Sequence, residues 1–252
     1  MAITALVGLI AAVIIVAGVL IGNGGGSSAP AAAARSRFKA VPVNRTRSKS
    51  SLPGGHGALV AVVTRSTTLR GAPSGHAIAR LPKRTEFDSP VELWVVRRSG
   101  AWLGVVSTLA GNGHVGWIPR SATALTRVPW EIDVSLSARR ATVLHGGKVV
   151  KRYTIAVGAP GSPTPTGRFA VTDRLTTGDP SGPYGCCILA LSARSPHAIQ
   201  GWAGGNRIAI HSTPETSSIG QAASHGCMRL TLAEGKWLLD HVPLGTPTII
   251  RA

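Results

Sequence analysis

The sequence predicts a mainly β protein: an N-terminal membrane-spanning helix, a small β barrel, and a larger, mostly β domain with one late helix. Three observations predict this fold class. A charge-free apolar run occupies residues 2–21. Short strand-like runs punctuated by Gly and Pro follow from residue 57 onward. One segment with helix-capping residues lies near the end.

Composition narrows the possible partners. The 252 residues include 27 Lys and Arg against 10 Asp and Glu, a formal net charge of +17. Such a surface attracts polyanions, including nucleic acid, anionic lipid and acidic cell wall. We expect no nucleic acid, because the sequence has no zinc finger, basic recognition helix or aromatic RNA-binding motif. Three Cys without a C-x-x-C pair argue against a metal site.

Residues 1–22 are predicted to be a transmembrane anchor or signal segment. Twenty helical residues, at about 1.5 Å each, just span the roughly 30 Å hydrocarbon layer. A cleaved signal peptide is the alternative, but its apolar region is usually only about 7–15 residues long, which favours an uncleaved anchor. Residues 23–56, rich in Gly, Ser, Ala, Pro and basic residues, are predicted to be a basic, disordered linker.

Residues 57–129 are predicted to form a small β module. Strand-like runs occur at residues 58–64, 91–96, 102–106 and 114–119. A Gly-containing loop between the second and third runs suits a hairpin. Several short strands without a helical period indicate a small barrel.

Residues 130–252 are predicted to be mostly β with one helix. The runs at 130–137, 168–173, 207–211 and 247–251 read as strands, and Gly146-Gly147 between two alternating runs indicates a hairpin. Thr231 and Glu234 form a capping-box pattern that starts a helix over residues 231–241. Pro243 is expected to stop that helix.

The segment Ser224-His225-Gly226-Cys227 carries the candidate chemistry. A thiolate is the reactive form of Cys, and a nearby His lowers the thiol pKa or accepts its proton. Two histidines are candidate partners. His225 would point the same way as Cys227 on a strand, whereas His211 ends a separate predicted strand and reaches Cys227 only through the fold. The alternative is a buried structural Cys with unrelated histidines.

Several segments together resemble a known family. IAIHST and ASHGCMRL look like the signature of the L,D-transpeptidase (YkuD-type) catalytic domain. The matches DVSLSARRATVLHGGKVVKRYTIAVG, PTPTGRF, GPYG and GTPTII run in the expected order over residues 130–252. In the module, LRGAPSG, LPKRTEF, GAWLGVV and GWIP resemble a bacterial SH3-like domain. The first resemblance implies a β-sandwich-like fold and an enzyme that remodels peptidoglycan.

The resemblance also implies roles for individual residues. Cys227 is the expected nucleophile and His211 the expected general base, with Ser212 orienting the imidazole through its backbone. Backbone N–H groups of His225, Gly226 and Cys227 are expected to form the oxyanion hole. The remaining expected site residues shape the site or bind substrate: Ser224, Arg229 and Tyr184. No metal or organic cofactor is expected.

The expected activity is two-step acyl transfer between peptidoglycan stem peptides. A Cys227 thioester forms after the third residue of a tetrapeptide, and an amine resolves it to give a cross-link between third-position residues. Two alternatives are an L,D-carboxypeptidase or hydrolase on the same scaffold and a non-catalytic wall-binding protein. Carbapenem-type β-lactams are expected inhibitors. The expected location is the extracytoplasmic envelope, against anionic cell wall, with residues 2–21 in the membrane.

Cys186 and Cys187 are adjacent and match no family motif. We interpret them as two small apolar side chains at the end of a strand, in preference to a redox pair.

Overall fold

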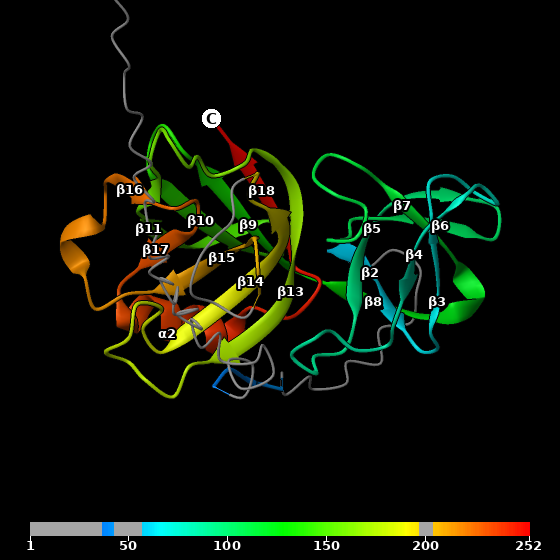
Figure 1. Ribbon diagram of the computed structural model, residues 1–252, viewed down its shortest axis with the longest axis horizontal. Coiled ribbons are helices and arrows are strands. Elements are labelled where there is room, and N and C mark those ends of the chain that lie inside the picture. The colour runs from blue at the N-terminus through cyan, green and yellow to red at the C-terminus, as the bar shows by residue number, and fades with distance from the viewer. Residues whose placement is uncertain (1–36, 43–56, 197–203) are drawn as a thin grey trace, which may run out of the picture.

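A computed structural model describes residues 37–42, 57–196 and 204–252, and the structural statements below concern these residues. They form two large β-sheets side by side, with a short two-stranded sheet beside the second (Figure 1). The predicted membrane-spanning run, residues 2–21, lies outside the described residues. Within them, no helix is long and apolar enough to span a membrane.

The first sheet contains seven strands in the order β4-β3-β7-β6-β5-β2-β8. Leu69, Leu103 and Ile118 anchor its core and are almost fully buried. The edge strand β4 was not predicted, because most of its residues face solvent and give no buried alternation. The strands are β2 (Ala58–Val63), β3 (Thr67–Arg70), β4 (Ala77–Leu81), β5 (Glu92–Ser99), β6 (Trp102–Val105), β7 (Gly116–Pro119) and β8 (Thr123–Val128), with a 3-10 turn η1 (Arg120–Ala122).

The second sheet follows the order β11-β10-β9-β18-β13-β14-β15-β17. The predicted hairpin between β10 and β11 is confirmed, and Gly146 and Gly147 turn it with φ of +58° and +77°. The strands are β9 (Trp130–Ser135), β10 (Arg140–His145), β11 (Lys148–Thr154), β13 (Gly167–Thr176), β14 (Cys187–Arg194), β15 (Arg207–Ser212), β17 (Met228–Leu230) and β18 (Pro247–Arg251). The separate short sheet pairs β12 (Val157–Gly158) with β16 (Ala222–Ser224), and η2 (Thr216–Ser218) precedes β16.

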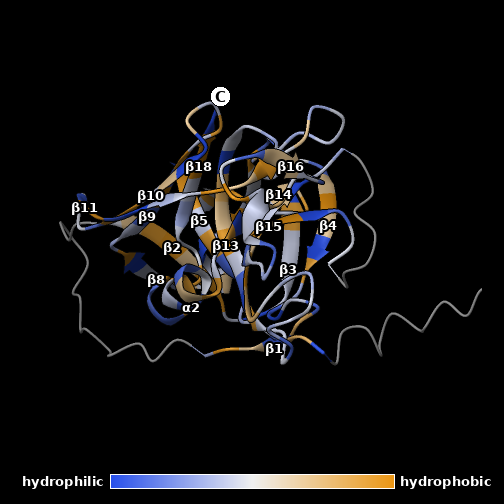
Figure 2. Cartoon of the chain, turned by 90° about the vertical axis from the view of Figure 1, so that its left-hand side faces the viewer, coloured by the Kyte–Doolittle hydropathy of each residue, from blue (hydrophilic) through white to orange (hydrophobic). Residues whose placement is uncertain are grey.

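The second sheet curves around one apolar core. Val134 and Val143, near one end of the strand order, share that core with Leu189 and Ile210, near the other end. Apolar stretches of the chain lie mainly on the strands (Figure 2). This mainly β architecture with one α-helix among the described residues agrees with the predicted fold class.

Alternation along β15 divides its side chains between two faces. Ile208 and Ile210 point into the main core. Arg207, Ala209 and His211 therefore lie on the opposite face, because successive strand residues alternate. A second apolar cluster covers that face, and it contains Ala209 and Cys227.

The predicted helix is α2 (Leu232–His241). Its capping box is present: the Glu234 N–H donates to Thr231 Oγ1 at 3.3 Å, and the Thr231 N–H donates to Glu234 Oε2 at 3.0 Å. Gly235 lets the helix approach β15, since a Cβ there would lie 2.6 Å from the Cβ of Ser212. The helix ends before Pro243, as expected.

One part of the predicted linker behaves differently from the expectation of a disordered segment. Lys39–Ala40 form β1, which pairs antiparallel with the end of β13. Phe38 and Ala40 pack against the second apolar cluster. Through Phe38 and Ala40, this short stretch of the basic linker binds the second apolar cluster.

Candidate active site

Cys227 lies in the turn between β16 and β17, and only 6% of the residue is exposed. The N–H of Ala209 in β15 donates to its Sγ at 3.4 Å. Burial raises the pKa of the Cys227 thiol to about 11, while the Ala209 N–H and the charge of Arg229 oppose that shift. The resting sulfur is therefore a neutral thiol that needs a base before it can attack.

The turn that presents Cys227 is fastened from two sides. Ser224 Oγ donates to the carbonyl of Cys227 at 2.6 Å and accepts from the N–H of Gly226 at 3.1 Å. From the 159–166 loop, Thr164 Oγ1 donates to the carbonyl of Gly226 at 2.8 Å. Gly226 itself has φ of +112°, a conformation that favours glycine. The sequence marked the PTPTGRF segment but did not single out Thr164.

His211 is the buried histidine of the site, at the end of β15 and 3% exposed. Its Nδ1 donates to the carbonyl of Ser212 at 2.8 Å, because a carbonyl oxygen can only accept. The lone pair therefore lies on Nε2, which is free to take a proton. Burial lowers the pKa of His211 to about 4; the Ser212 carbonyl opposes this and the Arg229 charge adds to it. The imidazole is neutral at physiological pH.

The pairing of β15 with β17 brings His211 and Cys227 together. Ile210 pairs with Met228 and His211 with Arg229 in a parallel register. Cys227, one residue before Met228, thus lies beside the strand end that carries His211. The two residues are separated by the η2 segment in sequence and meet only through this register.

His225 does not fit the role that its spacing suggested. On a strand, His225 and Cys227 would point the same way, but residues 225–227 form a turn around Gly226. The side chain of His225 is exposed, whereas Cys227 is buried. Of the two candidate bases, only His211 shares the buried face with the sulfur.

Cys186 and Cys187 form a disulfide, so their interpretation as two apolar side chains was wrong. Cys227 is consequently the one free cysteine of the three. The disulfide contacts the residue that orients His211: Cys186 Sγ lies 3.4 Å from Ser212 Oγ, and the Cys187 N–H donates to that same oxygen at 3.1 Å. Adjacent cysteines give no sequence signal for such a bond, since disulfide patterns are read from longer spacings.

Arg229 and Tyr184 flank the histidine. The Tyr184 ring meets the His211 ring edge-on, with centroids 5.0 Å apart. Burial, followed by the neighbouring Cys227, raises the pKa of Tyr184 to about 12, so its hydroxyl stays protonated. Arg229 is half-buried in β17, and none of the described residues accepts a hydrogen bond from its Nε. Its guanidinium can therefore receive a carboxylate from a substrate.

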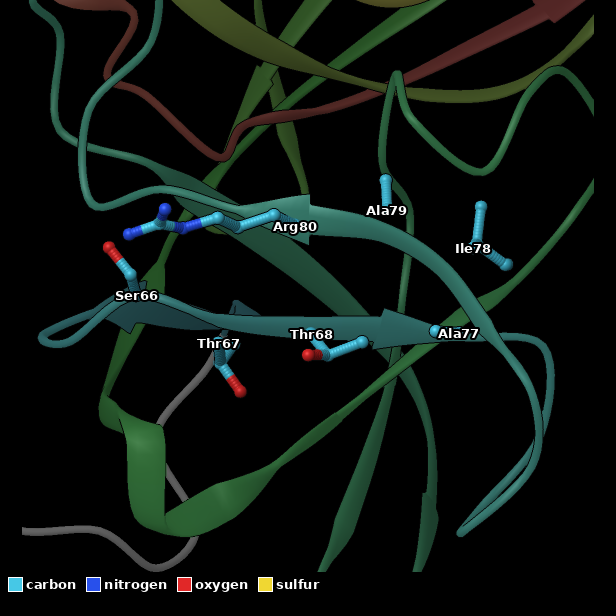
Figure 3. Close-up of a pocket in the computed structure, with 7 residues that line it drawn as sticks. All are labelled: Ser66, Thr67, Thr68, Ala77, Ile78, Ala79 and Arg80. Carbon is cyan, nitrogen blue, oxygen red and sulfur yellow. The ribbon is translucent and has the colours of Figure 1, made fainter.

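A separate hollow lies on the first sheet, along β3 and β4 (Figure 3). It contains no thiol, imidazole or carboxylate, so the chemistry does not reside there. Within the described ranges, no group of three His, Cys, Asp or Glu side chains is placed to hold a metal ion. The hollow is lined by Ser66, Thr67, Thr68, Ala77, Ile78, Ala79 and Arg80.

About half of the chain is similar to known proteins. Residues 129–250 match the family model of the L,D-transpeptidase catalytic domain. The Bacillus subtilis protein YkuD, which carries the name of an L,D-transpeptidase, is 35% identical over 123 residues, or 49% of this chain and 66% of the relative. L,D-transpeptidase 1 of Mycobacterium tuberculosis is 32% identical over 124 residues, 45% of this chain and 47% of the relative. The matched region thus spans less than two thirds of these relatives.

A solved L,D-transpeptidase structure from Mycobacterium tuberculosis is similar at 21% identity, over 55% of this chain and 72% of that chain, with a TM-score of 0.41. The predicted resemblance of the C-terminal domain to L,D-transpeptidase catalytic domains is confirmed by the family match.

Proposed function

We propose that this chain is a peptidoglycan L,D-transpeptidase that cross-links third-position residues of stem peptides through a thioester on Cys227. One observation carries the proposal. The buried thiol of Cys227, held by the Ala209 N–H, lies on the face of β15 that also carries His211. His211 is neutral, with its proton fixed on Nδ1 and its lone pair on Nε2. A neutral thiol and a neutral imidazole on one buried face are the components that base-assisted acyl transfer requires.

In the first step, Nε2 of His211 takes the thiol proton while the sulfur attacks the carbonyl carbon of the third stem residue. The bond to the terminal D-alanine breaks, and its amine leaves with the proton from His211. The N–H of Gly226 already donates to Ser224 Oγ. The oxyanion of this step therefore uses the N–H groups of His225 and Cys227.

In the second step, an amine from a neighbouring stem gives a proton to His211 and attacks the thioester. The new amide forms, and the sulfur leaves and regains a proton from His211. Arg229, with an unused donor in the site, binds a stem-peptide carboxylate. The Tyr184 ring packs edge-on against the His211 ring and restricts its rotation.

We also propose that residues 57–129 are an SH3-like module that, with the basic linker, holds the enzyme against the anionic wall. The support is the chain's net charge of +17 and the seven-stranded arrangement of short strands. Anchoring by residues 2–21 stays a prediction from the sequence.

Intact-protein mass spectrometry of the purified full chain with a carbapenem tests this proposal. The strained lactam of a carbapenem acylates an activated thiol. One adduct per protein is expected, and none for Cys227→Ala. His211→Gln should slow adduct formation by about 10²–10⁴-fold, the usual contribution of a general base. The comparison variant is His225→Gln, which replaces the exposed imidazole and keeps the backbone N–H of residue 225. Its rate should stay within a few-fold of the unmodified protein.

Product analysis then separates the transpeptidase from its alternatives. With a tetrapeptide stem as the only substrate, a transpeptidase gives a cross-linked dimer, whereas a hydrolase gives a shortened monomer. Wall binding without either product, in a protein that forms no carbapenem adduct, would contradict the enzyme assignment.

A further inference from the structure

The loop of residues 82–91 lies between β4 and β5 of the first sheet. It reaches the face of the second sheet that carries Ala209 and Cys227. We call it the docking loop. Its Phe87 is only 5% exposed and packs in one apolar cluster with Ala209 and Cys227. In Figure 1 the two sheets lie side by side, with β5 beside β13. A residue from the N-terminal module thus belongs to the same buried apolar cluster as the candidate nucleophile.

The docking loop has a defined shape around Thr85. Thr85 Oγ1 accepts from the N–H of Phe87 at 3.3 Å and from the N–H of Ser89 at 3.2 Å. The Thr85 N–H donates to the carbonyl of Ser89 at 2.9 Å. The same hydroxyl donates to the carboxylate of Asp173 in the second sheet. One side chain therefore closes the loop and fixes it to the catalytic domain.

The point of attachment is a buried ion pair. Asp173 in β13 is fully buried and pairs with Arg207 in β15, which is 3% exposed. Arg207 also pairs with Glu86 of the docking loop. Buried charges are tolerated when they are paired and hydrogen-bonded. The loop supplies two of the partners, Thr85 and Glu86, so this ion pair favours the docked arrangement.

The attachment lies on the strand that holds the reacting groups. Arg207, Ala209 and His211 share one face of β15. Arg207 contacts the docking loop, the Ala209 N–H contacts Cys227 Sγ, and His211 is the candidate base. The Arg207 guanidinium also packs over the Phe87 ring, with its Cζ 5.7 Å from the ring centroid.

We infer that Phe87 is a positioning residue of the active site, contributed by the N-terminal module, which covers Cys227 and holds its sulfur against the Ala209 N–H. The inference rests on the proposed function for the identity of the reaction. Because Phe87 excludes water from the thiol, its removal should have two opposite effects. The sulfur becomes more accessible and ionises more readily, and it loses the fixed position that acyl transfer needs.

Outer layers of the same cluster support this role. Phe38 meets the Phe87 ring edge-on at 6.2 Å and the Tyr184 ring at 6.2 Å. Tyr184 in turn contacts His211. Aromatic side chains from the linker, the docking loop and the catalytic domain thus form one wall beside the catalytic pair.

The test compares two reactions of Cys227 in the full chain: acylation by a carbapenem and alkylation by iodoacetamide, a small neutral reagent. Phe87→Ala should slow acylation by about tenfold or more, since small misplacements of reacting groups are costly. The same variant should speed alkylation at neutral pH. Phe87→Leu, which restores most of the apolar volume, should bring both rates back toward those of the unmodified protein.

Arg168→Ala is the matched control. The Arg168 guanidinium packs over the Trp94 ring, with its Cζ 4.4 Å from the ring centroid, and so also joins the two sheets. It lies at the opposite end of β13 from Leu175, which belongs to the cluster that contains Phe87. Seven strand steps at about 3.3 Å separate Arg168 and Leu175. This variant should leave both rates unchanged. Equal loss of acylation in Arg168→Ala and Phe87→Ala would overturn the inference, because both would then act by loosening the docking of the sheets.

Failure of the inference and failure of the proposed function give different results. If the unmodified protein forms no carbapenem adduct, the proposed function is wrong, and the alkylation comparison still tests the cover over Cys227. If the unmodified protein is acylated and Phe87→Ala matches it in both reactions, the positioning role is wrong. Should Phe87→Ala unfold, as judged by circular dichroism, Phe87→Val takes its place in the same comparison.

Discussion

The ionisation of Cys227 gives the sharpest prediction. Burial raises the pKa of its thiol from an ordinary 9.0 to about 11. A rise of about two units lowers the thiolate fraction near pH 8 by roughly 100-fold, or about 2.7 kcal/mol at 1.36 kcal/mol per unit. His211, with a pKa lowered to about 4, is neutral at the same pH. The pair should therefore rest as thiol and imidazole rather than as thiolate and imidazolium.

The assay is a pH titration of ultraviolet thiolate absorbance, taken as the difference between the unmodified protein and Cys227→Ser. The disulfide between Cys186 and Cys187 does not titrate, so the difference reports one thiol. We expect no thiolate signal from about pH 5 to pH 9 and a rise near pH 11. In parallel, the rate of carbapenem acylation should fall as pH drops through about 4, where His211 takes a proton.

Thiolate absorbance at neutral pH would refute this reasoning. It would mean either that Cys227 and His211 form an ion pair in the resting site, or that the Ala209 N–H and the Arg229 charge together outweigh burial. A titration of His211→Gln separates the two explanations of such a result. Loss of the neutral-pH signal in that variant would assign the thiolate to an imidazolium partner.

Three further predictions concern stability. The folded His211 has a pKa of about 4, below the ordinary 6.5, so the unfolded state binds its proton first and stability falls as pH drops from 6.5 to 4. The loss should reach about 3 kcal/mol in urea unfolding, and His211→Gln should lack it. Gly226→Ala places a Cβ 2.9 Å from Ile208 Cδ1 at φ of +112°. It should cost about 1–3 kcal/mol and reduce carbapenem adduct formation; unchanged values of both would contradict the turn geometry. Thr231→Ala removes the capping box and should cost about 1 kcal/mol in urea unfolding while acylation stays unchanged.

Local signals in the sequence predicted local structure well. The capping pair Thr231 and Glu234 located α2 to within a residue, and Gly146-Gly147 located the β10–β11 hairpin. The capping box and the Gly-Gly turn each involve only a few consecutive residues, so the local sequence is enough to predict them. Residue spacing alone left His211 and His225 as alternative partners of Cys227. The family resemblance selected His211.

Contacts between distant segments could not be read in the same way. Thr85 and Asp173 are 88 residues apart, and Thr164 and Gly226 are 62 apart. Each contact is made by the hydroxyl of a threonine in a loop, and such a residue carries no periodic pattern. His225 was a candidate base because alternation was assumed where Gly226 makes a turn, and one positive φ reverses the conclusion.

Phe87 connects the ionisation of Cys227 with its position. The high thiol pKa arises mainly from burial, and Phe87, in the docking loop, belongs to the same buried apolar cluster as Cys227. The N-terminal module should therefore help to set the ionisation of the candidate nucleophile as well as its position. Phe87→Ala should shift the onset of thiolate absorbance to lower pH, and Arg168→Ala should not. An unshifted titration in Phe87→Ala would assign the burial of Cys227 to the second sheet alone.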